Sequence, residues 1–575
     1  MTRLFNDPKN FAQEFVDGFV RACPHYVRKV YGGIVRSTQS RAGKVAVISG
    51  GGGGHFPAFA GFVGQGFLDG AVTGNIFASP SASQVASVAK AADQGGGVLL
   101  GFMNYAGDVL HFGQAAERLR AEGIEVRTAV TTDDIASASD AERSKRRGIA
   151  GSMHVLRVAS GAAEAGLDLD EVTRLFVHAN ENVRTFGVAF SGCTLPGAEG
   201  PLFTVPEQRI GVGLGIHGEP GIEEIDLATS DEVARLLVTR LVAEAPQGAG
   251  KRVVVQLNGL GSAKYEELYV TYGAVLNELQ AAGLEVVEGE VGEFMTSLDM
   301  GGVSLTVMWL DDELELHYFS ECDTVAYRRR LPLAEQLPAD VEFSVEAPLI
   351  EVGAKGGEES RRLAGHIALL AAQVAEAMET AESHLGAIDA VAGDGDHGIG
   401  MVKGSAAAAE AARELAEQGG GALTVLVGAG DRWAEASGGA SGALWGAALT
   451  AAGNVLGNDR GADLATQLKA VKAFVSAIER LGGASLGDKT MLDAQLAFAS
   501  AFEAGLQKGG SATEIWEEAA RAAEDAATNT AQLEPKLGRA RVLAQRSIGW
   551  PDPGAVSFGI IATTAAEAVR SGGEG

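Results

Sequence analysis

Cysteine is scarce in this chain. Only three of the 575 residues are cysteines, Cys23, Cys193 and Cys322, and they lie far apart with no C-x-x-C pair among them. Thiols so few and so scattered exclude a disulfide framework and a cysteine-ligated zinc site. We therefore expect a protein of a reducing compartment, the cytoplasm.

Positive charge and long apolar runs are also lacking. The formal net charge is -28 at pH 7 and the pI is near 4.8, so nucleic acid and anionic membranes would be repelled. No apolar run reaches the ~18 residues of a membrane helix, and the first residues, MTRLFNDPKNFAQEF, contain no apolar signal segment. We expect neither a membrane span nor export, and any phosphate ligand should arrive with a metal ion.

Glycine, in contrast, is abundant. The chain has 79 glycines, roughly twice the usual share of about 7%, and they gather in short clusters between apolar segments. Hydrophobic residues make up 46% and charged residues 21% of the sequence, as in ordinary globular domains. Since single cores rarely exceed ~250 residues, this length predicts three or more compact units with tight glycine loops.

The first 330 residues have the pattern of an α/β domain. Short apolar runs such as KVAVIS and GVLLGF alternate with amphipathic segments such as SASQVASVAKAAD, which is typical of strands followed by helices. A second group of runs, RVVVQLNGLG, VSLTVMWL and ELELHYF, predicts further strands. We therefore expect two α/β subdomains in residues 1–330, divided near residue 185.

The composition changes after residue 330. Residues 331–356 contain three prolines and show little periodicity, which indicates a linker. Residues 357–575 are rich in alanine, leucine and glutamate at helical spacing. This last part is predicted to be an all-α domain.

Three aspartates stand close together in the segment DAVAGDGDHG. Asp389, Asp394 and Asp396 lie within eight residues, and carboxylates at that spacing repel one another unless a cation neutralises them. Carboxylate oxygen is the ligand that Mg²⁺ and Ca²⁺ prefer. An EF-hand is excluded because Gly398 stands where a further Asp or Asn is needed. The segment predicts a hard-cation site, with a solvated acidic turn as the alternative.

Two glycine-rich segments of the same domain precede predicted helices. They are SGGASGALWG (437–446) and GWPDPGAV (549–556), and free backbone N–H groups at such helix starts attract phosphate. Neither is a Walker A motif, and GDKT (487–490) lacks the adjacent Gly-Lys. Each segment alone is equally typical of close helix packing. Together with the aspartates, they predict a magnesium and nucleotide site.

Three glycine-flanked loops at strand ends carry reactive residues in the first domain. SGGGGGHFPAF holds His55, FMNYAGDVLHF holds Asp108 in an expected turn, and GVGLGIHGEPG holds His217. Glycine lets a ligand approach the main chain, and open α/β sheets bind ligands at strand ends. The five-glycine run is not a dinucleotide fingerprint, because Phe56 and Pro57 stand where the last glycine belongs. One loop histidine is more often structural, but three such loops favour a small-molecule site.

Nine motifs in order carry a resemblance to a known family. The first domain has GHFPAFAGFVG after its glycine run, NYAGD, RRGIAG, GIHGEPG and NGLG, and the second has DAVAGDGDHG, GGASGALWG, GDKTMLDA and PDPGA. With these motifs the chain resembles the single-chain, ATP-dependent dihydroxyacetone kinase family over nearly its whole length. The resemblance implies a two-part α/β ketose-binding domain followed by an ATP-binding barrel of about eight antiparallel helices.

The resemblance also implies roles for individual residues. His217 would form a covalent hemiaminal with the ketose carbonyl, a reaction that glycerol cannot undergo. His55 would hydrogen-bond the substrate, and Asp108 would accept the proton of the attacking hydroxyl. The substrate pocket would also include Gly52, Gly53, Gly54 and Met103. Two Mg²⁺ ions would be held by Asp389, Asp394 and Asp396. ATP would lie against Asp394, Gly395, Asp396, His397, Ala440, Ser441, Gly442, Gly487, Asp552, Pro553 and Gly554.

Four positions depart from the family pattern. Where relatives usually have GSGHEP and KNYTGD, this chain has Gly53, Phe56, Met103 and Ala106. Polar groups are therefore missing near the expected substrate, and the freed volume would suit a four-carbon ketose. Erythrulose and dihydroxyacetone are both candidate substrates.

Two alternatives to an ATP-dependent ketose kinase are considered. One is a kinase that takes phosphate from a phosphotransferase-system protein, which the presence of both domains on one chain disfavours. The other is a ketose sensor without turnover, which Asp108 and the three metal-binding aspartates disfavour because binding alone needs neither. The resemblance further implies a homodimer, in which the helical domain of one subunit serves the substrate domain of the other.

Overall fold

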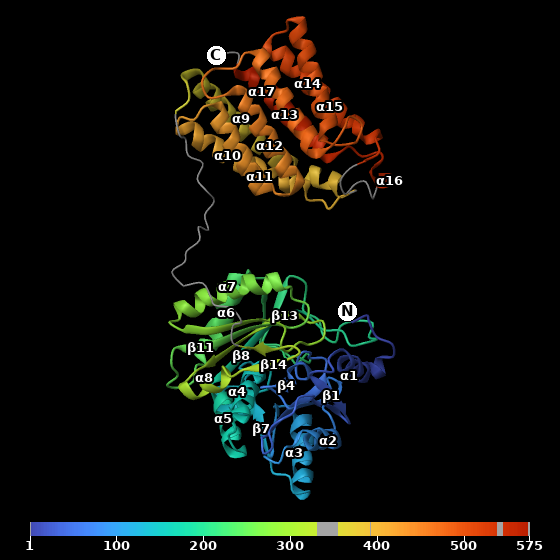
Figure 1. Cartoon of the computed structure of the whole chain (residues 1–575), viewed down its shortest axis with the longest axis vertical. Helices are drawn as coiled ribbons and strands as arrows, with labels where there is room; N and C mark the ends of the chain where they lie inside the picture. Colours follow the sequence, from blue (N-terminus) through green and yellow to red (C-terminus); the bar gives the residue numbers. More distant parts are fainter. Residues whose placement is uncertain (1, 331–354, 392, 537–543, 573–575) are drawn as a thin grey trace. The chain divides into compact units, whose positions relative to one another are not determined.

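A computed structural model describes residues 2–330, 355–391, 393–536 and 544–572. The chain divides into two units, Met1–Pro338 and Ala339–Gly575, and each is described by itself (Figure 1). The linker predicted at 331–356 lies outside the described residues except for its last two, of which Gly356 donates a backbone hydrogen bond to the carbonyl of Gly419. Among the described residues, no helix is both long and apolar enough to span a membrane.

The first unit contains a six-stranded sheet in the order β1-β2-β5-β3-β6-β7. Its strands are β1 (Val27–Val30), β2 (Gly33–Arg36), β3 (Ala46–Gly53), β5 (Gly70–Ile76), β6 (Val98–Met103) and β7 (Val126–Thr131). Strands β3, β5, β6 and β7 pair in parallel, whereas β1 and β2 are antiparallel. Because parallel strands end at one edge of a sheet, the glycine run that ends β3 lies near the segment after β6.

Helices α1 (Phe11–Ala22), α2 (Ala82–Ala92) and α3 (Ala106–Ala121) belong to this sheet. A capping box starts α2, since the Ser81 hydroxyl accepts from the Gln84 backbone and the Gln84 side chain accepts from the Ser81 backbone. Val85 and Val88 of α2 are buried against the sheet at helical spacing. Helix α3 begins three residues after β6, so its first turn lies at the edge where the glycine run ends.

A second six-stranded sheet has the order β10-β9-β8-β13-β11-β12. Its strands are β8 (Val183–Ser191), β9 (Arg209–Val212), β10 (Glu223–Asp226), β11 (Arg252–Gly259), β12 (Glu285–Gly292) and β13 (Gly301–Trp309). Only β11 and β12 pair in parallel. Helices α6 (Ser230–Ala243) and α7 (Tyr265–Ala281) pack against this sheet, and β13 is buried along its whole length at the sheet centre.

Helices α4 (Ser152–Ala165) and α5 (Leu169–Glu181) follow β7. Residues 152–163 of α4 are all buried, and the helix contacts β3 and β6 as well as α5 and α8 (Asp312–Tyr318). A helix that is covered on every side is a core element, which explains its small and apolar residues. Helix α4 therefore fills the centre of the first unit.

The segment ELELHYF, predicted to be a strand, forms helix α8 instead. The Asp311 carboxylate caps this helix by accepting hydrogen bonds from first-turn backbone N–H groups. Leu314 and His317 are buried at helical spacing, while Leu316 is 69% exposed. The alternation of Glu and Leu has the two-residue period of a strand, and this led to the wrong prediction, although only one of the two leucines is buried.

A small sheet returns the end of the first unit to its beginning. Strands β4 (Gly64–Gln65), β14 (Cys322–Thr324) and β15 (Arg328–Arg329) pair in the order β15-β14-β4. One hydrophobic core accordingly contains residues from both ends of this unit, such as Phe67 and Tyr327. The two α/β sheets thus share a core, and the chain crosses back after the second.

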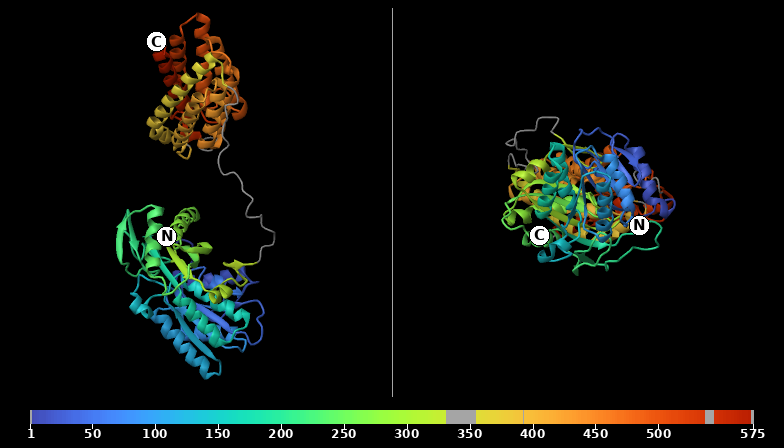
Figure 2. Two further views of the ribbon diagram at one scale, coloured as in Figure 1. Left: turned by 90° about the vertical axis from the view of Figure 1, so that its left-hand side faces the viewer. Right: turned by 90° about the horizontal axis from the view of Figure 1, so that it is seen from below.

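The second unit is all-helical. Its helices are α9 (Glu358–Asp389), α10 (His397–Glu417), α11 (Ala422–Ser437), α12 (Gly439–Leu456), α13 (Leu464–Gly482), α14 (Met491–Lys508), α15 (Ala512–Asn529), α16 (Ala544–Ser547) and α17 (Pro553–Gly572). Apart from the short α16, each packs against the next, and α17 packs against α9 as well as α15, which closes the ring. Figure 2 shows these helices side by side. A two-part α/β unit followed by an all-α unit confirms the predicted fold class.

Candidate active site

Two histidines from distant parts of the first unit face each other. His55 follows β3, and His217 lies in the loop between β9 and β10. Their Nε2 atoms are 3.0 Å apart. Nδ1 of His55 donates to the Thr296 carbonyl at 2.7 Å, and Nδ1 of His217 lies 3.2 Å from the Glu219 carboxylate. These four residues form one hydrogen-bonded row.

Burial and charge differ along this row. His55 is 1% exposed, and its burial lowers its pKa to about 3, so its ring is neutral at pH 7. Burial alone would raise the pKa of Glu219, but hydrogen bonds from His217 lower it to about 2. His217 therefore lies between a neutral ring and an ionised carboxylate. A histidine held in this way can present a ring nitrogen to an electrophilic carbonyl.

Aromatic rings enclose the histidine pair. Phe77 stacks on His55 with ring centres 5.1 Å apart, and Tyr105 meets His217 edge to face at 4.9 Å. Burial raises the pKa of Tyr105, and its hydroxyl has no hydrogen-bond partner among the described residues. Sequence reasoning missed these rings and also Glu219. Tyr105 and Glu219 lie inside the motifs NYAGD and GIHGEPG, whereas Phe77 lies in no motif.

Asp108 lies in the first turn of α3, not in a turn between elements as the sequence predicted. It is 4% exposed, and burial raises its pKa to about 6. Its carboxylate accepts a hydrogen bond from Ser79 and interacts electrostatically with His217. Its Oδ1 atom has no hydrogen-bond partner among the described residues. A buried carboxylate with an available oxygen can accept a proton from a hydroxyl.

The glycine run is required by close packing of the chain on itself. A Cβ on Gly52 would lie 2.6 Å from the Ala78 nitrogen, and one on Gly54 would lie 2.8 Å from the Phe77 ring. Gly54 also has φ of +102°, which side-chain-bearing residues rarely adopt. These glycines let the segment after β5 reach the end of β3, and that approach places Phe77 on His55. The Cβ positions of Gly52 and Gly54 are therefore occupied by neighbouring atoms of the protein, although both glycines also line a cavity.

Gly53 and Phe56, two of the departures from the family pattern, lie close to neighbouring residues. A Cβ on Gly53 would lie 3.3 Å from both the Gly74 oxygen and Ile76, which is a close contact. The Phe56 ring packs edge to face on Phe15 and Phe19 of α1. Gly53 and Phe56 both line an apolar cavity, and the expectation of an enlarged pocket stays a prediction.

The remaining substrate residues lie nearby in the fold. Met103 ends β6, is 2% exposed and belongs to the hydrophobic core, and Ala106 begins α3. A separate apolar cavity of about 280 Å³ borders the glycine run, but His55, Asp108 and His217 do not line it.

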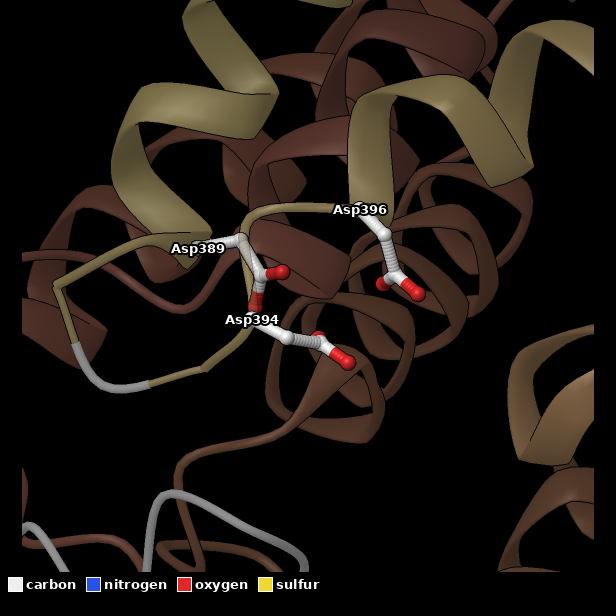
Figure 3. A group of neighbouring side chains, drawn as sticks. All are labelled: Asp389, Asp394 and Asp396. Carbon is white, nitrogen blue, oxygen red and sulfur yellow. The ribbon is translucent and has the colours of Figure 1, made fainter. Parts of the chain in front are cut away.

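In the second unit, the three aspartates come together as predicted. Asp389 ends α9, Asp394 lies in the connecting loop, and Asp396 directly precedes α10. Each offers a carboxylate oxygen within 4.8 Å of the others, and Figure 3 shows their side chains around one space. The Asp389 carboxylate also accepts a hydrogen bond of 2.9 Å from the Gly395 backbone. Three converging carboxylates, two of them exposed, are a donor set that fits Mg²⁺.

The aspartates line a cavity of about 620 Å³. Most residues expected to bind ATP line the same cavity: Asp394, Asp396, His397, Ala440, Ser441, Asp552, Pro553 and Gly554. Gly395, Gly442 and Gly487 do not line it. Helices α10, α12, α14 and α17 begin at this cavity, so the positive ends of four helix dipoles favour anions such as phosphate there.

Further residues of this cavity were missed by sequence reasoning. Lys489 is 5% exposed and lines the cavity, and its Nζ donates to the carbonyls of Leu533 and Ser547 at 3.1 and 2.6 Å. Burial lowers the pKa of Lys489 and raises that of Asp552 to about 7. Lys489 lies in the motif GDKTMLDA. In that motif the lysine was considered only as a possible Walker A lysine, so it was not predicted to line the cavity.

Comparison with protein families divides the chain in the same way. Residues 17–326 match the Dak1 domain, and residues 391–567 match the DAK2 domain. An L-erythrulose kinase of Pectobacterium atrosepticum is 50% identical, with 98% of this chain and 95% of that protein covered. A D-erythrulose kinase of Mycolicibacterium smegmatis is also 50% identical, with 100% of both chains covered.

A solved structure shows the same architecture. The dihydroxyacetone kinase of C. freundii, in complex with AMP-PNP and Mg²⁺, is 30% identical, and the match has a TM-score of 0.63. It covers 98% of this chain and 99% of that one. Both units, their order and nearly the whole length are thus shared, and the chain belongs to the dihydroxyacetone kinase family of ATP-dependent ketose kinases.

Proposed function

We propose that the protein transfers the γ-phosphate of ATP to a terminal hydroxyl of a short-chain ketose that His217 holds as a hemiaminal. The observation that carries this proposal is the row of His55, His217 and Glu219 beside the buried carboxylate of Asp108. A kinase that bound its alcohol by hydrogen bonds alone would need no histidine held between an ionised carboxylate and a neutral ring. Ketones react with such a nitrogen, and simple alcohols do not.

Each residue of the row has a defined task in this proposal. His217 bonds to the carbonyl carbon and fixes the distance between the ketose and Asp108. His55 hydrogen-bonds the oxygen that was the carbonyl. Asp108 accepts the proton from the terminal hydroxyl as that hydroxyl attacks phosphorus, and its raised pKa of about 6 leaves it ionised at pH 7. Positioning supplies much of the rate in such phosphoryl transfers.

The cavity of the second unit is the proposed nucleotide site. Asp389, Asp394 and Asp396 would hold two Mg²⁺ ions, which supply charge neutralisation for the phosphates when bound. The first turns of α12 and α17, with Ser441 and Gly554, would donate backbone hydrogen bonds to phosphate oxygens. Lys489 ties the segments at Leu533 and Ser547 to the cavity wall and keeps that side of the pocket in place.

We propose erythrulose or dihydroxyacetone as the ketose. The names of the 50%-identical relatives support erythrulose, and the name of the 30%-identical structure supports dihydroxyacetone. Both substrates carry a carbonyl next to a hydroxymethyl group, which is all that the row and Asp108 require. We further propose a homodimer acting in the cytoplasm, on the basis of the family resemblance and the scarcity of cysteine.

A coupled ADP assay tests the proposal. Dihydroxyacetone, D-erythrulose and L-erythrulose should be turned over, and glycerol should not, because only a carbonyl compound can be captured. Equal turnover of glycerol and ketoses would rule out capture. Failure of added ATP to exchange with bound ADP would indicate a phosphoprotein-dependent kinase. Binding of a ketose without turnover of any ketose would indicate a sensor.

A further inference from the structure

The hydrogen bonds of the histidine row determine where its protons are. The Thr296 carbonyl can only accept, so Nδ1 of His55 carries a proton and donates to it at 2.7 Å. Since the His55 ring is neutral, its Nε2 has a lone pair. The facing Nε2 of His217, 3.0 Å away, must then be the donor of the bond that joins the two rings. In the ligand-free site, the reactive nitrogen is thus protonated and covered by His55.

The other edge of the His217 ring is occupied by a carboxylate. Nδ1 of His217 lies 3.2 Å from Oε1 of Glu219, and the His217 backbone N–H donates to Oε2 of the same group at 2.9 Å. An ionised carboxylate can only accept, so Nδ1 carries a proton as well. Both oxygens of Glu219 are therefore used to hold one residue, His217.

Glu219 is itself fixed from the other side. The Arg147 guanidinium lies 3.9 Å from Oε2 of Glu219, and Arg147 in turn is paired with Asp134 at 2.8 Å. The other groups against the His217 ring are the rings of His55, Phe77 and Tyr105. Asp108 is the further charged group that interacts with it. Among these, Glu219 is the group that contacts Nδ1.

We propose that Glu219 is a positioning residue that keeps a proton on Nδ1 of His217, so that Nε2 is the nitrogen that bonds to the ketose. This inference rests on the proposed capture of the ketose by His217. It goes beyond that capture by assigning the residue that decides which nitrogen reacts and what charge the adduct carries. Without Glu219, a neutral His217 is free to keep its single proton on Nε2, and loss of that proton to His55 would then leave an imidazolate anion instead of a neutral ring with a lone pair on Nε2.

The proton count of the capture step follows from this assignment. Nε2 of His217 first gives its proton to Nε2 of His55, and the electron pair of that N–H bond stays on Nε2 of His217 and forms the bond to the carbonyl carbon. The π electrons of the carbonyl move to its oxygen, which then takes the proton back from His55. The ring is positively charged before the step and, as a substituted imidazolium that keeps its Nδ1 proton, after it. The ion pair with Glu219 therefore persists, and no proton is taken from or released to solvent.

Substitution of Glu219 by glutamine is the most informative variant. The glutamine amide has one accepting oxygen and one donating NH₂ group, but both of its partners on His217 are donors. If the oxygen satisfies the backbone N–H, the NH₂ group faces Nδ1 and favours the tautomer with a lone pair there. Glu219→Gln thus keeps the size of the side chain and reverses the preference that we propose.

The first test is ¹⁵N NMR of histidine-labelled, ligand-free protein, with His217→Asn used to assign the signals. We expect Nδ1 of His217 to be protonated in the wild-type protein and in Glu219→Asp, and unprotonated in Glu219→Gln. An unprotonated Nδ1 in the wild-type protein, or the same protonation in Glu219→Gln, would overturn the proposal. If Glu219→Gln does not fold, the wild-type and Glu219→Asp spectra decide alone.

The second test is kinetic and has a matched control. The value of kcat/KM for the ketose should fall about 10²- to 10⁴-fold in Glu219→Gln, the range known for loss of a correctly placed proton, and less in Glu219→Asp. Glu223→Gln, which changes a nearby glutamate paired with Arg240 on the surface, should leave kcat/KM unchanged. Equal activity of Glu219→Gln and the wild-type protein would contradict the assignment.

The two proposals fail in different ways. With [2-¹³C]dihydroxyacetone, capture replaces the carbonyl resonance of bound ketose by that of a tetrahedral carbon. If Nδ1 is protonated as expected but no tetrahedral resonance appears, the role of His217 in capture is wrong while the effect of Glu219 on its protons stands. If the resonance appears equally in the wild-type protein and in Glu219→Gln, capture stands and the role of Glu219 is wrong.

Discussion

His55 and Asp108 in the first unit are 1% and 4% exposed, whereas Asp394 and Asp396 in the second unit are exposed. The residues that we propose to hold the ketose are joined by hydrogen bonds to one another and to the backbone. The carboxylates that we propose to bind Mg²⁺ line a cavity instead. This difference suits two kinds of recognition. Burial shifts the pKa values of groups that take part in proton transfer and nucleophilic attack. Carboxylates without a bound cation destabilise the fold less when they are exposed to water than when they are buried.

The largest expected effect comes from removing the exposed carboxylates of the second unit. Replacing both Asp394 and Asp396 by asparagine leaves too few carboxylates for Mg²⁺, and kcat should fall about 10⁴-fold. The tetrahedral ¹³C resonance of the bound ketose should remain, because the buried half is intact. Turnover in an ADP-release assay measures the first effect. Asp525→Asn, which changes an exposed aspartate of α15 outside the cavity, should be neutral, and a similar loss there would refute the assignment.

Removing the His217 ring from the buried site of the first unit should give a somewhat smaller loss of activity. Without the His217 ring, the ketose is bound only by hydrogen bonds, so kcat/KM for ketoses should fall about 10³-fold in His217→Ala. ADP affinity, measured by calorimetry with Mg²⁺, should not change. His25→Ala removes an exposed histidine of the same unit and serves as the control. Loss of ADP binding in His217→Ala would mean that the two halves are not separable.

The role of Asp108 can be tested through pH. Its pKa of about 6 predicts that kcat/KM rises as the pH increases through about 6, because only the ionised carboxylate accepts a proton. In Asp108→Asn, kcat should fall about 10²-fold and this rise should disappear, while the ketose adduct persists. A pH profile that keeps the same rise in Asp108→Asn would assign it to another group.

The smallest expected effect concerns stability. Burial raises the pKa of Asp108 above its unfolded value, so between about pH 4 and pH 6 the folded state binds more protons than the unfolded state. The free energy of unfolding therefore falls as the pH rises through this window, and the loss is complete above it. Asp108→Asn cannot titrate, and at pH 7.5 it should be more stable than the wild-type protein by about 1–3 kcal/mol. Urea unfolding at pH 4 and pH 7.5 measures the difference, and a less stable variant at pH 7.5 would contradict this.

Much of the fold could be predicted because local patterns agree with it. Strands β3 and β6 are continuous apolar runs, and the capped helix α2 has a clear helical period. Helix α8 was misread because two Glu-Leu pairs alternate like a strand, and burial of Leu314 but not Leu316 becomes apparent only in the packed structure. The return of β14 to β4 joins residues about 260 apart, and no local pattern predicts such a pairing.

The candidate site was predictable to the extent that its residues lie in motifs. The three aspartates converge within one short loop, so their spacing in the sequence already brings them together. Phe77 was not predictable, because its place against His55 depends on how the β5 end packs on Gly54. Glu219 is only two residues from His217 in the sequence. The contacts of both its carboxylate oxygens with His217 depend on the loop conformation, which the sequence does not reveal.

The central claim is that His217 bonds covalently to the ketose without help from the nucleotide unit. A crystal structure of the full chain soaked with dihydroxyacetone, without nucleotide or Mg²⁺, tests it most directly. We expect continuous electron density between Nε2 of His217 and a tetrahedral ketose carbon, with the His55–His217 hydrogen bond broken. A planar, intact ketone lying at hydrogen-bond distance from His217, with the His55–His217 bond unchanged, would contradict the account.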